Sequence, residues 1–150
     1  FFVAKDAPEA AAWMKSNLSR INEMVAVHQP VADGPLTPAT ESKVWAIPDG
    51  FRVKASSEGV SALLLPFHFS RCLKAKNKEG DPIPVKIIRA NLYQTLLIFE
   101  RKLDARVTFE FGPWGNTACR KDDAQDMVDL RILEEMAEEF NCHWKGCRIK

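Results

Sequence analysis

Residues 83–149 contain two junctions of the same kind, and this recurrence constrains the fold more strongly than any other feature of the sequence. At residues 100–104 and again at residues 138–141, charged residues are followed by a large apolar residue and then by Asp or Asn. Asp and Asn tolerate the left-handed conformation with which many helices end. The stretch therefore predicts strand, helix, strand, helix and strand in that order, a β-α-β-α-β unit.

Residues 91–103 should form the first helix of this unit. Asn91 is a suitable N-cap, and the apolar residues at positions 92, 96, 99 and 103 share one helical face. Tyr93, Thr95 and Ile98 favour a strand instead, and this alternative stays open. The second helix is expected at residues 121–140, and the strands at residues 83–89, 106–111 and 142–149.

An amphipathic helix is expected at residues 7–28, because apolar residues recur there at spacings of three and four. Asp6 is its expected N-cap, with Pro8 in the first turn. Residues 29–43 hold three prolines and predict a linker, which lets the helix pack in cis or against a partner. The side chains expected to face inward are Met14, Leu18, Ile21 and Val25.

The middle of the chain predicts short strands and one short helix. Strands are expected at residues 44–47 and 51–55, joined by the turn Pro48-Asp49-Gly50. A helix is expected from Glu58 to about Leu65, because Pro66 would break it. Beyond Pro66, alternation predicts a strand over residues 67–76, a turn at residues 77–82 and a returning strand.

These elements predict one α+β domain, or an α/β variant of it, spanning residues 1–150. Its parts are the N-terminal helix at residues 1–28, the linker at residues 29–43 and a sheet-and-helix core at residues 44–150. The core should hold a mixed sheet of about five or six strands. The longest apolar run, residues 62–67, is far shorter than the roughly 20 residues that cross a membrane, so no membrane insertion is expected.

The four cysteines, at positions 72, 119, 142 and 147, predict free thiols in an intracellular, cytoplasmic protein, because they are too sparse for a disulfide scaffold. A secreted protein with two disulfides is the alternative. Cys142, His143 and Cys147 lie close together, but the sequence lacks the second ligand pair of a structural zinc site. None of the three histidines lies in a sequence pattern that would pair it with a catalytic carboxylate or with other metal ligands. The sequence therefore predicts no metal, no cofactor and no catalytic residue.

Charge is segregated along a chain whose net charge is only +1. Residues 51–90 carry eight basic and three acidic side chains, whereas residues 122–139 carry one basic and eight acidic side chains. The basic region predicts, as an alternative function, nucleic-acid binding by a basic hairpin. A sheet edge guarded by lysines would give the same pattern. The residues of this candidate surface are Arg71, Lys74, Lys76, Lys78, Lys86 and Arg89.

The acidic helix and the N-terminal helix predict the leading function, which is non-catalytic binding of a protein partner or of a second copy of the chain. A charge run of this kind is also typical of a solvated helix face. A small enzyme is the third candidate, although the sequence contains no Gly-rich phosphate-binding loop. The acidic residues expected at the adaptor surface are Asp126, Asp129, Glu134 and Glu138.

Overall fold

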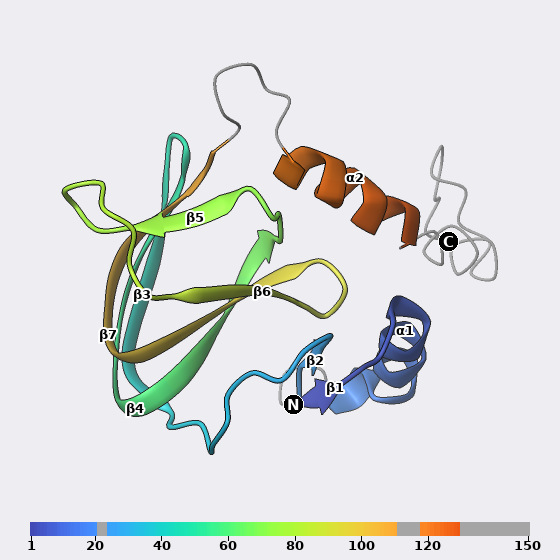
Figure 1. Ribbon diagram of the computed structural model, residues 1–150. Helices are drawn as coiled ribbons and strands as arrows, with labels where there is room; N and C mark the ends of the chain where they lie inside the picture. The colour runs from blue at the N-terminus through green and yellow to red at the C-terminus, as the bar shows by residue number, and fades with distance from the viewer. Residues whose placement is uncertain (21–23, 111–117, 130–150) are drawn as a thin grey trace, which may run out of the picture.

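The computed structural model describes residues 1–20, 24–110 and 118–129, which form one mixed sheet of seven strands and two α-helices (Figure 1). The strand order is β1-β2-β6-β7-β4-β3, and β5 pairs with β7 off this path. The β1–β2 pair is parallel, and the other pairs are antiparallel. The elements are β1 (Phe2–Val3), α1 (Ala7–Ser16), a 3-10 helix (Leu18–Arg20), β2 (Ala26–Val27), β3 (Ala39–Ile47), β4 (Gly50–His68), β5 (Leu73–Lys76), β6 (Lys86–Ala90), β7 (Gln94–Phe109) and α2 (Ala118–Asp129).

Strands β4 and β7 form a long antiparallel ribbon that bends in its middle. Residues 50–56 of β4 pair with residues 102–108 of β7 to form the first arm. Residues 60–65 of β4 pair with residues 95–100 of β7 to form the second arm. Between the arms the ladder has a bulge, where Arg101 adopts a positive φ of 59°. The first arm is flanked by β3 and β5, and the second arm by β6.

The two arms fold toward each other around the main core (Figure 1). A straight strand of the length of β4 would span about 60 Å. The rings of Phe51 and Phe67, from opposite ends of β4, nevertheless stack with their centroids 4.6 Å apart. The main core includes Phe51, Val53, Leu65, Leu97, Phe99, Leu103 and Val107. A second core, on the other face of the second arm, includes Val27, Val31, Ile88, Leu96 and Ile98.

Strand β7 shows that the helix predicted at residues 91–103 is wrong. Positions 96–99 are all buried, because β7 has a core on each of its faces. A strand that is buried on both faces shows a continuous apolar run in place of alternation, and such a run also fits one face of a helix. Asn91 and Leu92, with φ angles of 47° and 70°, lie in the turn between β6 and β7.

The helix predicted from Glu58 to Leu65 is also wrong, because these residues continue β4 through the bulge. Pro66 falls at an irregularity of the ladder with β7, which explains how a strand accommodates it. The predicted strand over residues 67–76 is divided between the end of β4 and β5. The hairpin at residues 44–55, by contrast, is confirmed as β3 and the start of β4.

Helix α1 confirms the predicted start of the N-terminal helix but is much shorter than predicted. Oδ1 of Asp6 accepts a hydrogen bond from the backbone N–H of Glu9 at 2.9 Å, as expected of an N-cap. The helix ends at Ser16, and the side-chain amide of the C-cap residue Asn17 donates a hydrogen bond to the carbonyl of Trp13 at 2.8 Å. Residues 26–27 then form β2 in place of a helical turn.

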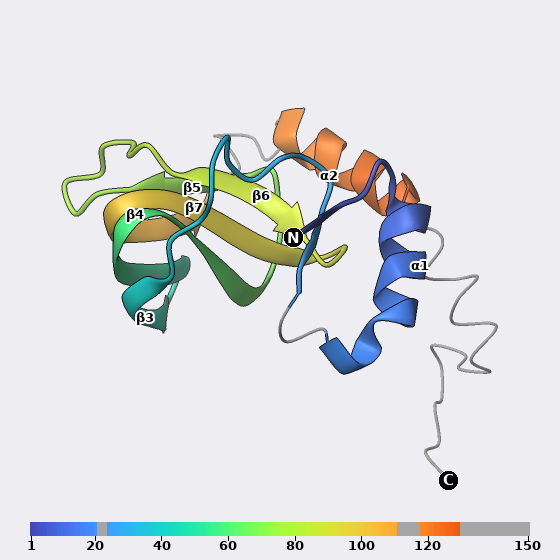
Figure 2. The ribbon, with the colours of Figure 1, turned by 90° about the horizontal axis from the view of Figure 1, so that it is seen from below.

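The side chains of the N-terminal segment that face inward also differ from those predicted. Leu18 is 62% exposed, while Met14 and Val25 are half-buried. Strands β1 and β2 extend the sheet beyond β6, which anchors this segment in cis. Both α-helices lie on the side of the molecule away from β3 (Figure 2).

Some predicted elements lie wholly or partly outside the described residues. Ile21 and the strand predicted at residues 142–149 lie outside them. The helix predicted at residues 121–140 is described only up to Asp129, where α2 ends. The β-α-β-α-β unit is not formed as predicted, because β7 replaces its first helix. The linker predicted at residues 29–43 is shorter, since β3 begins at Ala39.

Candidate binding surfaces

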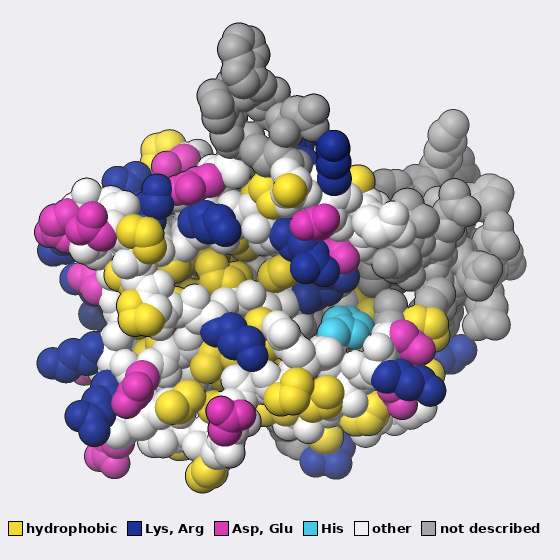
Figure 3. Space-filling model, in the orientation of Figure 1, with side chains coloured by type: hydrophobic (Ala, Val, Ile, Leu, Met, Phe, Trp, Pro, Cys, Tyr) yellow, Lys and Arg dark blue, Asp and Glu magenta, His cyan; other side chains and the backbone are white. Residues whose placement is uncertain are grey.

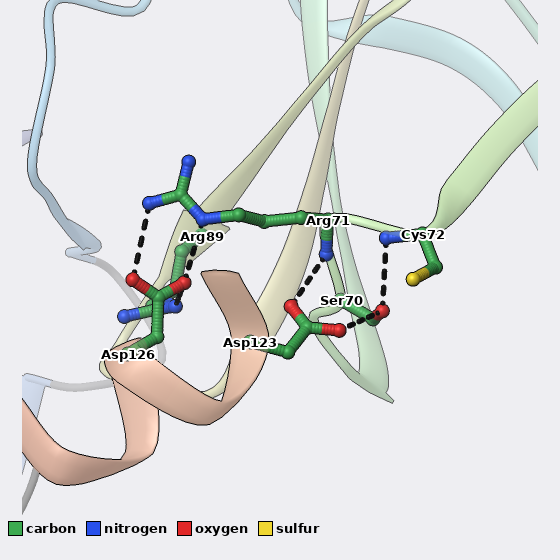
Figure 4. Close-up of polar contacts among 6 residues, drawn as sticks. All are labelled: Ser70, Arg71, Cys72, Arg89, Asp123 and Asp126. Atoms are coloured by element: carbon green, nitrogen blue, oxygen red, sulfur yellow. Dashed lines mark hydrogen bonds and ion pairs between the residues drawn. The ribbon is translucent and has the colours of Figure 1, made fainter. Parts of the chain in front are cut away.

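A cluster of charged side chains joins α2 to the sheet (Figure 4). The carboxylate of Asp126 accepts two hydrogen bonds from Arg71, from Nε at 2.8 Å and from Nη2 at 3.1 Å. It also accepts a hydrogen bond from Nη2 of Arg89, a residue of β6. The guanidinium of Arg89 lies over the ring of Phe69, with Cζ 5.2 Å from the ring centroid. Two arginines outside the helix therefore hold one carboxylate of the helix.

Burial and charge shift the pKa of several groups around this cluster, among them Asp126 and His28. Burial alone would raise the pKa of Asp126, but hydrogen bonds from Arg71 and the positive charges of Arg89 and Arg71 lower it below its ordinary value. The pKa of His28 is lowered, first by burial and then by the positive charge of Arg89. Asp126 is therefore ionised and His28 is mostly neutral at pH 7.

A cavity of about 590 Å³ opens beside the cluster. This volume is within the range of roughly 300–1,000 Å³ that is typical of small-molecule sites. The cavity combines charged groups with apolar walls. Its lining includes Lys5, Asp6, Pro8, His28, Phe69, Arg71, Ile87, Ile88, Arg89 and Asp126.

Helix α2 is also held by a second carboxylate and by a disulfide. Asp123 accepts hydrogen bonds from the hydroxyl of Ser70 and from the backbone N–H of Arg71. Cys119, in the first turn of α2, is bonded to the fully buried Cys72. The disulfide corrects the prediction of free thiols for these two cysteines and is compatible with secretion.

The outer face of the first arm carries a row of side chains that crosses four strands. Lys76 of β5 lies opposite Arg106 of β7, and Arg106 lies opposite Arg52 of β4. Arg52 in turn lies opposite Trp45 of β3, with Cζ 5.6 Å from the centroid of the Trp45 ring. Acidic side chains neutralise part of this row: Arg52 pairs with Asp104 at 2.9 Å, Arg106 with Asp49 at 3.5 Å, and Lys76 with Glu110.

Strand β3 forms an exposed edge of the sheet. It pairs with β4 on one side, and all of its nine residues except Ile47 are exposed. The large apolar side chains of Val44 and Trp45 are 37% and 39% exposed. A long exposed edge strand offers its backbone to another strand.

A further cavity of about 590 Å³ lies between β5 and β6, which pair with different parts of β7. Apolar side chains are visible between these strands in Figure 3, with basic side chains beside them. The apolar lining comes from Phe69, Leu73, Ala75, Pro82, Ile83, Val85 and Ile87, and the charged lining from Arg71, Lys74, Lys76 and Glu110. This opening adjoins the cavity beside the arginine cluster, because Phe69, Arg71 and Ile87 line both.

The six basic residues that were predicted to bind nucleic acid do not form one surface in the structure. Arg71 and Arg89 contact Asp126 at the helix. Lys74 and Lys76 lie on the outer side of β5, Lys78 lies in the turn after β5, and Nζ of Lys86 donates a hydrogen bond to the carbonyl of Pro30 at 2.9 Å.

The acidic residues predicted to bind a protein partner are described only in part. Asp126 faces the sheet, as its contacts with two arginines show. Asp129 is the last residue of α2, and Glu134 and Glu138 lie outside the described residues.

The sequence alone does not show that Trp45, Arg52 and Arg106 lie on one surface. The alternation of Arg52 and Lys54 with buried residues did indicate an outward basic face on β4. The register of β4 with β7 was also needed, and it was hidden because part of β7 was assigned to a helix.

Comparisons with protein-family models, with curated proteins and with solved structures found no match to this chain. In the described part of the chain, no group of three or more His, Cys, Asp or Glu side chains could hold a metal ion. No helix of that part is long and apolar enough to cross a membrane. The candidate binding surfaces of the described residues are the β3 edge, the outer face of the first arm and the arginine cluster.

Proposed function

We propose that this protein is a non-catalytic binding domain that joins a protein partner through the exposed edge of β3. The observation that carries this proposal is a strand of nine residues in which all but the last are exposed. Strand addition at such an edge gives affinity through main-chain hydrogen bonds and specificity through side chains. The acidic helix is the weaker candidate surface, because Asp123 and Asp126 contact other parts of the same chain.

The geometry of the β3–β4 hairpin decides which residues of β3 offer their backbone to a partner. Ile47 and Gly50 flank a two-residue loop, and such flanking residues form a hydrogen-bonded pair. Counting back along β3, the odd-numbered residues bond to β4. Ser42, Val44 and Ala46 therefore direct their N–H and C=O groups outward, and they are the attachment points for a further strand.

A second copy of the chain is the partner that fits this edge. When two β3 strands pair antiparallel about a two-fold axis at Ser42, Glu41 of each copy lies opposite Lys43 of the other. This register uses the outward backbone groups, and it places two opposite-charge pairs where side chains approach most closely. A register centred on Lys43 would instead place two lysines opposite each other, which is unfavourable.

Val44→Pro is expected to abolish this self-association without unfolding the protein. Proline removes the outward N–H of residue 44, and no hydrogen bond between β3 and β4 is lost, because that N–H does not point toward β4. Proline is tolerated in an edge strand when its nitrogen faces solvent. Val44→Thr is the matched control, because threonine keeps both the N–H and the strand preference. Sedimentation velocity should show a concentration-dependent dimer for the parent and for Val44→Thr, and a monomer for Val44→Pro.

An unchanged dimer of the Val44→Pro variant would mean that association does not use the outward backbone of β3. A parent protein that stays monomeric at every concentration would rule out the second copy as the partner. Circular dichroism of each variant, recorded beside the sedimentation runs, separates lost association from lost folding.

Nucleic-acid binding is the second candidate function, and the outer face of the first arm favours it. Proteins that bind single strands combine basic side chains with aromatic rings on which bases stack, and Trp45 lies beside Arg52 in the basic row. Acidic side chains offset this charge, and the disulfide is typical of secreted proteins. Titration of a single-stranded oligonucleotide at two salt concentrations distinguishes the candidates: salt-sensitive binding that is lost in Trp45→Ala would favour nucleic acid.

A further inference from the structure

Arg89 is positioned by groups outside α2, whereas the backbone around Arg71 is held partly by Asp123 and by the disulfide of α2. Arg89 lies on β6, which pairs with β7, and its guanidinium rests on the ring of Phe69. The segment that carries Arg71 is anchored nearby, since the backbone N–H of Phe69 donates a hydrogen bond to the carbonyl of Tyr93 at 2.7 Å. The guanidinium of Arg89 should therefore stay in place when the carboxylate of Asp126 is removed, and Asp123 and the disulfide still hold the backbone of Arg71 beside it.

The contacts described between α2 and the rest of the chain at this site are polar, apart from the disulfide. Among the side chains of α2 that the structure describes, Cys119, Asp123 and Asp126 are half-buried and the others are exposed. Water reaches the ion pair of Arg71 with Asp126 from the Arg71 side, whose side chain is 50% exposed, whereas the ion pair of Arg89 with Asp126 is largely buried. An ion pair that water can reach contributes little to stability, so an external anion can compete with Asp126 from the Arg71 side of the site.

We propose that Arg71 and Arg89 form a binding site for a carboxylate ligand and that Asp126 occupies this site as an internal competitor. A carboxylate is the fitting class, because Arg71 already holds one through two hydrogen bonds and Arg89 through a third. The adjoining cavity has room for the rest of a small ligand. Its walls include Pro8, Phe69, Ile87 and Ile88, so the ligand carries a small apolar body.

This site is independent of the proposed function. It lies at the helix side of the molecule, whereas β3 lies on the other side (Figure 2). A failure of self-association through β3 would leave the carboxylate site unaffected, and the reverse also holds.

Isothermal titration calorimetry with phenylacetate tests the proposal. Phenylacetate should bind the Asp126→Ala variant at least about tenfold more tightly than the parent, since a tethered competitor acts at an effective concentration on the order of millimolar or more. Asp122→Ala is the matched control, because it removes an exposed carboxylate from the same helix and should bind phenylacetate like the parent. Phenylacetamide, the neutral analogue, should bind to none of these proteins.

Two further variants complete the test. Arg89→Met in the Asp126→Ala background should abolish the binding of phenylacetate, because it removes one of the two guanidinium groups. Asp126→Asn keeps an oxygen atom toward the arginines, so it should fold like the parent and still show a gain in affinity. A blocked dipeptide that contains aspartate distinguishes a peptide side chain from a free small carboxylate as the ligand. Equal affinities of the parent and both Asp126 variants for phenylacetate would overturn the proposal.

Discussion

Leu97→Ala is expected to lower the free energy of unfolding by about 2–5 kcal/mol. Leu97 is fully buried in β7, where its side chain belongs to the main core between the two arms. Leu96→Ala should cost a similar amount, because Leu96 is buried in the second core on the opposite face. Urea denaturation followed by circular dichroism measures both values. Large losses at two adjacent positions are expected of a strand that is buried on both faces.

Lys102→Ala is the control for this pair, since Lys102 is an exposed residue of the same strand. Its substitution should change the free energy of unfolding by no more than about 0.5 kcal/mol. A small loss for Leu97→Ala together with a large loss for Leu96→Ala would contradict the strand. That result would support a helix at residues 91–103, in which position 96 faces inward and position 97 does not.

Gly50→Ala is expected to cost about 3 kcal/mol or more. A Cβ atom at this position would lie 2.1 Å from the backbone oxygen of Val107 and 3.1 Å from Cα of Thr108. Both atoms belong to β7, which is paired with β4 on one side and with β5 on the other. The backbone of β7 therefore cannot move away without breaking the first arm.

Gly80→Ala provides the comparison for this clash. Gly50 and Gly80 both have a positive φ, of 156° and 96°, but no heavy atom lies within 4 Å of the position that the Cβ of residue 80 would occupy. Only the backbone penalty remains, so this variant should lose about 1–2 kcal/mol. Urea denaturation of the two variants in the same buffer gives the difference. Equal losses would contradict the close approach of β4 and β7 at Gly50.

The parts of the fold that local sequence determines were predicted correctly. The β3–β4 hairpin follows from Pro48-Asp49-Gly50 between two alternating segments, and the start of α1 follows from its N-cap at Asp6. The end of β7 agrees with the strand predicted at residues 106–111, but its first part was missed because both faces are buried there, which removes the alternation that identifies a strand. The longer course of β4 was missed because the bulge and Pro66 interrupt its alternation.

The candidate sites depend on contacts between residues that are far apart in the sequence. The sequence showed a basic region and an acidic region, but it gave no register between them. Arg71, between β4 and β5, and Arg89, on β6, belong to the basic region and meet Asp126 of the acidic region only in the folded chain (Figure 4). Arg52 and Arg106 likewise become neighbours only through the pairing of β4 with β7.

The most direct test of binding through β3 is sedimentation velocity on three charge variants of this strand. Glu41→Lys and Lys43→Glu should each weaken the dimer, because each places like charges opposite one another across the two-fold axis. The double variant that carries both substitutions should dimerise like the parent, since it restores both opposite-charge pairs with their signs reversed. A monomeric double variant, or single variants that dimerise like the parent, would contradict the pairing of two β3 strands at Ser42.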